Sequence, residues 1–472
     1  MGILSRILGR TSAPALETRR FDAAAGGRRW SGTPSFGRTG AETLAASAPI
    51  RSRARYFVAN NPWAANGVAA LVAGMVGAGI VPASQHPDPE ARKLIGAAFK
   101  RWSKKADSDG RTDLFGLHAA AVRAMVIDGE SFVHFEIRRD GLRLRLLPAE
   151  MIDESQTSEL ADGGYVVAGI EFDANGQRVA YHVLKSRPTD VFASTWGSVR
   201  VPAEDMLHLM HPLGAGQVRG ISWLAPVLLR LSELDQLEDA LLVGVKTAVM
   251  FAGFLIDQNA TGEPFDPNDP KGIMTVGLTP AVLQRLPSGF DIKFSAPQQA
   301  NQTAEFVSHQ IRAIAAGMGI PAYMVSGDLS SANYSSLRAG MVAFRQRLEQ
   351  VQFQTVIPQL CSPIFERVIG TLVLRGDLQA DGFESAQADY LSAEHYPPPM
   401  PWVDPVKEVG AIKDAIEAGL MSRRQGVAER GYDIETLDAE IASDREREAQ
   451  LKLNFGAATP QPAIGDPNDA NA

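Results

Sequence analysis

The sequence predicts an α+β fold of several parts, in which antiparallel strands precede long helices. Two segments, 131–147 and 165–185, alternate apolar and polar side chains around a short turn that contains glycine. The second half of the chain instead has long runs with apolar residues at helical spacing. Residues 60–210 are therefore predicted to be the α+β part, with mostly antiparallel strands.

Composition limits the classes of function. The 472 residues carry a net charge of -8, which argues against a basic face that wraps nucleic acid. An acidic protein can still surround DNA that must slide, because charge repulsion prevents adhesion. The single cysteine, Cys361, excludes intramolecular disulfides and thiolate zinc clusters and is typical of a reducing cytoplasm.

The first fifty residues are rich in Arg, Gly, Ser and Ala and show little periodicity. They are predicted to be a flexible arm, either a plain disordered tail or a segment that becomes ordered in an assembly. The start has no secretory apolar region, and Arg6 breaks a myristoylation motif. The apolar run Gly67–Val81 is too short to span a membrane, so its small residues instead predict close packing between helices.

The α+β part begins with a predicted helix, Leu114–Ile127, that ends at Asp128-Gly129. The turns that follow are expected at Asp140-Gly141 and at 173–176. The expected strands are, in order, 131–137, 142–147, 165–172, 178–185 and 200–212.

Two features near residue 210 suggest ligand sites but fit them poorly. His208 and His211 have no carboxylate or cysteine at ligand spacing and are predicted to be structural. The glycines of Gly214–Gly220 miss the dinucleotide spacing, since Arg219 stands where the third glycine should. The chain also has no Gly-Lys pair, which excludes a Walker A loop.

Two helices flank a small α/β insert. The first is expected to run from an N-cap at Ser222 to about Val249, and the second covers 303–317. Short strands and turns fill 251–295 between them. The first helix has an apolar stripe and an acidic face; the stripe is Leu224, Val227, Leu228, Leu231, Leu234, Leu241 and Val245, and the face is Glu233, Asp235, Glu238 and Asp239.

A polar loop follows the second helix, which is stopped by Gly319 and Pro321. A long helix then begins near Ser335 and extends to about Leu374. Its two internal prolines predict a kink or break. The apolar stripe of this helix is Met341, Phe344, Leu348, Val351, Val356 and Leu360; Arg338, Arg345 and Arg347 lie off it, on a solvated face or at channel or subunit contacts, and the prolines are Pro358 and Pro363.

The last hundred residues are predicted to be helical, with Gly419 and Gly431 as C-caps and disorder after Phe455.

Several long blocks, in order, give the chain a family resemblance. They include GQVRGISWLAPVLLRL, RAIAAGMGIP, SGDLSSANYSSLRAG and WVDPVKEVGAI. These blocks resemble the portal proteins of tailed bacteriophages, specifically the lambda family. One departure is Ala322, which separates the proline of the GIP block from Tyr323.

The resemblance implies an elongated portal-type subunit with an antiparallel-strand wing. Two stem helices would flank a small α/β clip, followed by a long kinked helix and a helical C-terminal crown. The implied parts are an N-terminal arm (1–50), wing (51–220), stem helix (221–250), clip (251–300), second stem helix (301–320), tunnel loop (321–335), long kinked helix with the rest of the wing (336–400), crown (401–455) and disordered tail (456–472).

The resemblance also implies where DNA would pass. Short polar residues suit weak contact with phosphates of any sequence. The implied tunnel-loop residues are Ser326, Asp328, Ser330, Ser331, Asn333 and Tyr334, and the implied stem residues are Arg230, Glu233, Glu238, Lys246 and Arg312.

Portal proteins form a ring, usually of twelve subunits, at one vertex of the capsid. The resemblance therefore implies a virion protein, assembled in the host cytoplasm, that conducts double-stranded DNA during packaging and ejection. Its expected partners are the large terminase, scaffold or major capsid protein and head–tail connector proteins, with no cofactor, metal, membrane or enzymatic activity. Two alternatives stay open: a non-channel minor capsid or adaptor protein, and a hydrolase or nuclease that uses Asp328 or a carboxylate pair.

Overall fold

The protein mixes helices with antiparallel sheets, as the sequence predicts. The computed structural model describes residues 39–187, 197–250, 254–257, 290–293, 300–330, 333–399 and 404–453. Most of the predicted arm, most of the predicted clip, Ser331 and the predicted tail lie outside the described residues.

The helices cluster in three parts of the sequence. Short 3-10 turns lie at Ala149–Met151 (η3) and Ala203–Asp205 (η4), and a π-helix, η5, lies at Gln352–Cys361. The α-helices are α1 (Thr39–Asn60), α2 (Pro62–Met75), α3 (Pro89–Ser103), α4 (Leu114–Asp128), α5 (Leu228–Met250), α6 (Ala300–Met318), α7 (Ala322–Ser326), α8 (Tyr334–Val351), α9 (Ser362–Leu374), α10 (Gln387–Leu391), α11 (Pro405–Glu417), α12 (Arg423–Ala428) and α13 (Ile434–Leu451).

The strands pair antiparallel throughout the described sheets. One sheet has the order β3-β2-β9, another has β4-β5-β6-β7-β8, and two strand pairs, β1-β12 and β10-β11, stand alone. The strands are β1 (Val81–Ser84), β2 (Glu130–Arg138), β3 (Gly141–Leu147), β4 (Ser158–Glu159), β5 (Tyr165–Val167), β6 (Ile170–Phe172), β7 (Arg178–Leu184), β8 (Ser198–Pro202), β9 (Met206–Met210), β10 (Phe254–Asp257), β11 (Phe290–Lys293) and β12 (Ala393–Tyr396).

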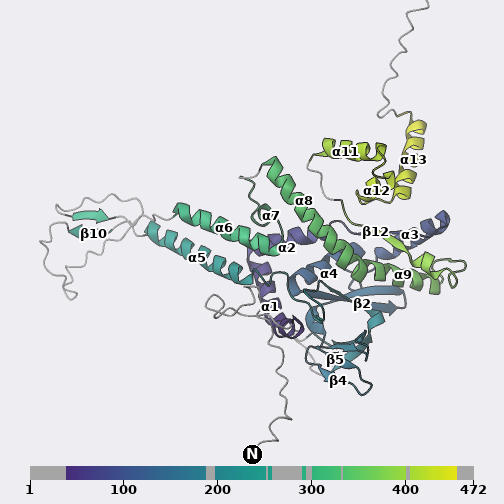
Figure 1. Cartoon of the computed structure of the whole chain (residues 1–472), viewed down its shortest axis with the longest axis horizontal. Helices are drawn as coiled ribbons and strands as arrows, with labels where there is room; N and C mark the ends of the chain where they lie inside the picture. Colours follow the sequence, from purple (N-terminus) through teal and green to yellow (C-terminus); the bar gives the residue numbers. More distant parts are fainter. Residues whose placement is uncertain are drawn as a thin grey trace, which may run out of the picture.

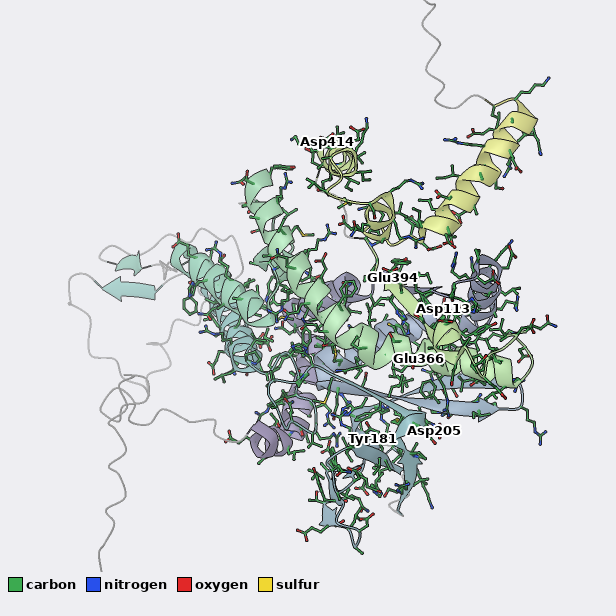
Figure 2. All side chains as sticks on the ribbon, turned by 45° about the vertical axis from the view of Figure 1, so that its right-hand side comes forward. Asp113, Tyr181, Asp205, Glu366, Glu394 and Asp414 are labelled. Carbon is green, nitrogen blue, oxygen red and sulfur yellow. The ribbon has the colours of Figure 1, made fainter. Side chains whose placement is uncertain are left out.

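The described molecule is extended (Figure 1). Helices α5 and α6 lie side by side and project from the body, with the β10–β11 pair beyond their ends. The sheets that contain β2, β4 and β5 lie on one side of the body, and α11, α12 and α13 lie on the other. Figure 2 gives the same division: Tyr181 and Asp205 lie among the sheets, whereas Asp414 lies on α11, across the long helix from them.

Close helix packing explains the small residues of α2. A Cβ added at Gly67 would collide with the end of the Met318 side chain, and one at Gly74 would collide with Leu348. Both neighbours are buried in the main core. The predicted role of the run from Gly67 in helix packing is therefore confirmed.

The long helix is continuous from Tyr334 to Leu374 because its middle is a π-helix. Pro358 lies inside η5, and Pro363 lies just after it, in the first turn of α9, so both prolines are in the interior of the continuous helix. Figure 1 shows the helix bending between α8 and α9, so the prolines kink it without breaking it. This run is long and apolar enough to cross a membrane. However, its apolar stripe is buried in the core of the protein, including Phe344, Leu348, Val356, Leu360 and Ile364.

Four sequence predictions are wrong in detail. Residues 39–50, assigned to the flexible arm, belong to helix α1. Helix α5 begins at Leu228, since residues 222–227 form hydrogen-bonded turns. The Ser222 hydroxyl accepts from the Leu224 N–H at 3.2 Å, as a cap would, and also donates to the Val126 carbonyl at the end of α4.

The other two errors concern strands. Residues 165–172 form a tight hairpin, β5–β6, because Ala168 and Gly169 have φ of 46° and 80°. The expected strand 200–212 is two strands in different sheets, separated by η4.

Candidate functional site

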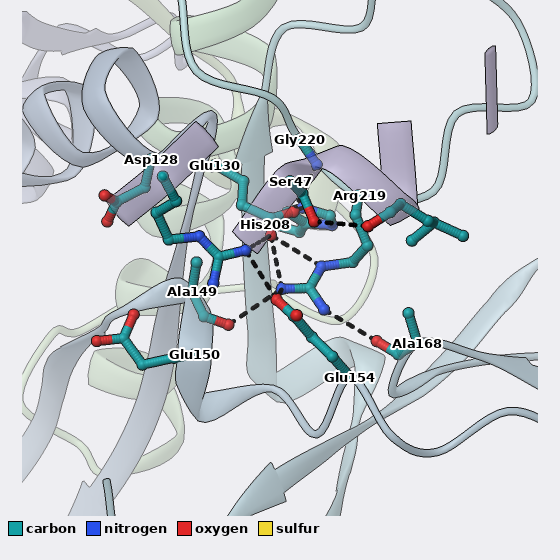
Figure 3. A network of polar contacts seen from close by, with 12 residues as sticks. Ser47, Asp128, Glu130, Ala149, Glu150, Glu154, Ala168, His208, Arg219 and Gly220 are labelled. Atoms are coloured by element: carbon teal, nitrogen blue, oxygen red, sulfur yellow. Dashed lines mark hydrogen bonds and ion pairs between the residues drawn. The ribbon is translucent and has the colours of Figure 1, made fainter. Parts of the chain in front are cut away.

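A buried charge network joins α1, the sheets and the segment that leads to α5 (Figure 3). The Arg219 guanidinium donates hydrogen bonds to a carboxylate and to two backbone carbonyls. It donates from Nε to Glu130 Oε1 at 2.8 Å, and to the carbonyls of Ala149 and Ala168, each at 3.0 Å. The other carboxylate oxygen of Glu130 accepts from the Gly220 N–H at 2.7 Å and contacts His208 Nε2 at 3.0 Å.

Charge compensation keeps the Glu130 carboxylate ionised beside Arg219. Burial favours the neutral acid, but Arg219 and His208 outweigh it, and the net effect lowers the pKa of Glu130. Burial also lowers the pKa of His208. Among the described residues no group of three or more His, Cys, Asp or Glu could hold a metal ion. His208 and Arg219 both contact the Glu130 carboxylate and so tie the two sheets to the segment that leads to α5.

Two glycines make the network possible. Gly129 has φ of 95° and caps the end of α4, and an added Cβ there would meet the backbone of Ile221. A Cβ at Gly220 would meet the Gly129 carbonyl. The two backbone segments approach so closely here that neither position has room for a side chain, so Gly220 is required by packing.

The predicted stem residues lie along the α5–α6 pair. Arg230 of α5 donates to Gln310 Oε1 of α6 at 2.9 Å and so ties the two helices together. Glu238 accepts from Trp63 Nε1 of α2 at 3.3 Å, near the body. Glu233, Lys246 and Arg312 are exposed. These five residues do not form one cluster.

The buried stripe of α5 ends partway along the helix. Leu228, Leu231 and Leu234 are buried, whereas further along Leu242 and Val245 are 53% and 55% exposed. Nearer the body, Leu229 and Phe306 line an apolar groove of about 320 Å³ between the helices. The projecting pair therefore exposes several large apolar side chains, which is typical of a surface that another protein covers.

The predicted tunnel loop is shorter than expected because both of its ends are helical. Ser326 closes α7, and Gly327 follows with φ of 69°. Asn333 is the N-cap of α8 in a capping box with Ser336. Tyr334 is the first residue of α8.

Turn hydrogen bonds organise what remains of the loop. The Ser330 N–H donates to Asp328 Oδ1 at 2.8 Å, and the Asp328 N–H donates to Ser326 Oγ at 3.1 Å. The bonds with Ser330 lower the pKa of Asp328. Asp328 and Ser330 are therefore close together and, like Leu329, exposed, whereas Ser326 is half-buried.

Two contacts that sequence reasoning missed hold the loop to the body. Asn66 of α2 donates from Nδ2 to the carbonyls of Met324 and Val325, at 2.8 and 3.0 Å. Lys407 of α11 lies over the Tyr334 ring, with Nζ 5.9 Å from its centre. Both pair residues far apart in the sequence, so no local pattern indicated them.

The described surroundings of Asp328 are turn contacts. Its described hydrogen bonds are with Ser326 and Ser330, and neither serine is accompanied there by a histidine or lysine in hydrogen-bond contact. The arrangement offers polar surface and backbone groups rather than a nucleophile with a base.

Comparison with known proteins identifies the family. The sequence model described as "Phage portal protein, lambda family" matches residues 26–352. A probable portal protein of Halomonas phage phiHAP-1 is 24% identical over 384 residues, covering 79% of this chain and 73% of that protein. Portal protein B of Escherichia phage lambda is 22% identical over 458 residues, covering 87% and 85%.

Among solved structures, the neck of an empty GTA particle, computed with C6 symmetry, aligns with a TM-score of 0.48 and 17% identity. It covers 85% of this chain and 95% of that chain. The family assignment depends on the sequence matches. Because the family model spans more than half of the residues, this chain belongs to the lambda family of phage portal proteins, which are structural proteins of the virion.

Proposed function

We propose that this chain is one subunit of a closed ring, of twelve copies as the resemblance implies, that conducts double-stranded DNA through the portal vertex. Helices α5 and α6 would be the stem, and residues 327–333 would face the channel. The clip between the stem helices would meet the large terminase during packaging and the head–tail connector proteins afterwards. Scaffold or major capsid protein would receive the ring during assembly in the host cytoplasm.

The exposed apolar surface of the projecting α5–α6 pair carries this proposal. Leu242, Val243 and Val245 are each more than half exposed, far from the core. Leu229 and Phe306 add to this surface nearer the body, at 73% and 51% exposure. Apolar surface of this kind is stabilised when another subunit covers it. A head-to-tail contact that repeats around an axis closes a ring.

The loop chemistry suits a channel that does not read sequence. Asp328, Ser330 and Asn333 use their polar groups to fold the loop itself, so these three residues are not pre-positioned to read bases. Exposed acids such as Glu233 and Asp239 would weaken adhesion to phosphate. We propose no enzymatic activity, cofactor or membrane association for this chain.

Electron microscopy with native mass measurement tests the proposal. We expect rings with an opening wide enough for duplex DNA. Leu242→Glu with Val245→Glu should abolish them, because two carboxylates cannot be buried in an apolar interface. Val199→Glu with Leu213→Glu is the matched control, since both side chains are exposed on another part of the chain.

Compact oligomers without an opening would refute the channel and favour an adaptor protein. If rings form with the stem substitutions but not with the control substitutions, the subunit interface does not lie on α5 and α6.

A further inference from the structure

A cleft with a cationic rim lies at the end of the body opposite the α5–α6 pair. Its walls are the C-terminal ends of α3 and α9 and the turn between β2 and β3, and its volume is about 350 Å³. Helices α3 and α9 pack through Phe99 and Phe365, whose ring centres are 5.2 Å apart. Figure 1 shows both helices on the far side of the body from α5 and α6.

The floor of the cleft is apolar and fixed. Trp102 donates from its indole Nε1 to the Leu142 carbonyl at 2.8 Å, which locks the ring between α3 and β3. Val368 and Leu372 of α9 complete the floor. A fixed aromatic wall beside aliphatic side chains is suited to receiving an apolar side chain.

The rim carries more positive than negative charge. Arg143 pairs with Asp140 at 2.5 Å, and Arg375 pairs with Asp377 at 3.0 Å, so these four charges offset one another. Arg101 and Lys105 also line the cleft and are exposed, and neither forms an ion pair within the described part of the chain. Arg101 and Lys105 therefore give the rim its net positive charge.

The same end of α3 extends the positive surface beyond the cleft. Lys100 and Lys104 are exposed on the neighbouring face of the helix, and Arg139 is exposed in the β2–β3 turn. This concentration of cations stands out in a chain whose net charge is -8.

We propose that this cleft docks an acidic segment of a partner protein that inserts an apolar side chain onto the Trp102 floor. Charge complementarity selects the acidic segment, and the floor supplies an anchor of the kind that dominates protein interfaces. The two carboxylates on the rim and the apolar floor disfavour duplex DNA, whose binding surfaces are polar and strongly positive. The inference does not depend on ring formation, because the whole cleft lies within one chain.

Fluorescence anisotropy with the full-length protein tests the cleft. The probe is a labelled 16-residue helical peptide of glutamate and alanine with leucines on one face. We expect saturable binding below about 100 µM in about 0.15 M salt. Arg101→Glu with Lys105→Glu should weaken binding at least about tenfold, and a peptide with serine in place of leucine should lose a similar factor because the apolar anchor is gone.

Lys93→Glu with Arg123→Glu is the matched control. It makes the same change in charge at exposed helical positions away from the cleft, and binding should stay within about twofold of wild type. Unchanged thermal unfolding of both variants would show that they are folded.

Three results would overturn the proposal. The first is no saturable peptide binding below about 100 µM. The second is equal weakening by both double variants, which indicates non-specific attraction. The third is a 24-base-pair duplex that binds more tightly than the peptide and is lost with Arg101→Glu and Lys105→Glu, which would assign the surface to nucleic acid.

Discussion

Removing the charge of Arg219 should destabilise the body strongly. In Arg219→Met the Glu130 carboxylate keeps its buried position, because the two side chains are only 1% and 0% exposed, but loses its nearest cation. The Ala149 and Ala168 carbonyls lose their donors at the same time. Breaking one side of a buried ion pair costs about 3–5 kcal/mol.

A second arginine should keep the cost near the lower end of that range. The Arg51 guanidinium lies 4.0 Å from the same Glu130 oxygen and is 5% exposed. Glu130→Gln added to Arg219→Met removes the uncompensated charge while retaining an amide that can bond its neighbours. The double variant should therefore recover about half of the lost stability.

Urea unfolding followed by tryptophan fluorescence measures these differences, with Arg123→Met as the control because Arg123 is exposed. The control should change the free energy of unfolding by less than about 0.5 kcal/mol. A cost for Arg219→Met below about 1 kcal/mol, or a double variant less stable than the single one, would refute the reasoning about buried charge.

Three further predictions follow from contacts in the body and the loop. Burial, with help from neighbouring His395, lowers the pKa of His118 to about 4, whereas the unfolded value is about 6.5. The unfolded chain thus binds more protons between these values, and about 3 kcal/mol of stability present above pH 6.5 should be lost as the pH falls towards 4. Thermal unfolding across this range should show a shallower slope for His118→Leu, and an unchanged slope would contradict the assignment. Gly220→Ala should cost about 1–3 kcal/mol in urea unfolding because its Cβ meets the backbone of Gly129. Gly96→Ala, with nothing within 4 Å, should instead stabilise α3 by up to about 1 kcal/mol, and equal effects at the two sites would remove the steric argument. Asn66→Ala frees two carbonyls at the end of α7, so amide exchange in 322–330 should accelerate about fivefold to tenfold while Asn60→Ala leaves it unchanged. No acceleration would mean that Asn66 does not restrain the loop.

Local chemistry explains which elements could be predicted. The Asp140-Gly141 turn and the Gly129 cap follow from residues that tolerate positive φ, and both are in the structure. The β5–β6 turn was missed because Ala168 gives no such signal, although its φ is 46°. The Ser222 hydroxyl accepts from the Leu224 N–H, as its sequence context predicts, but it also donates to the Val126 carbonyl, a contact that only the tertiary fold creates.

The candidate site shows the same limit. The polar composition of 326–334 predicted a loop, but the helical ends of that segment depend on the αL conformation of Gly327 and the capping box at Asn333. In the sequence, Arg219 is notable only because it occupies the position of the third glycine of a dinucleotide motif. Its role depends on Glu130, 89 residues earlier in the chain, and so could not be read from spacing.

The pairing of β1 with β12 has a consequence for synthesis. Val81 lies opposite Tyr396, so the partner of β1 leaves the ribosome about 315 residues later. At about 5–20 residues per second, that interval is roughly 15–60 s. Throughout it, the edge of β1 that pairs with β12 is open, and for most of it the faces of α2 at Gly67 and Gly74 lack their partners, Met318 and Leu348. The nascent chain must remain soluble during this time, so its yield in a cell should depend on elongation rate and chaperone supply as much as on final stability.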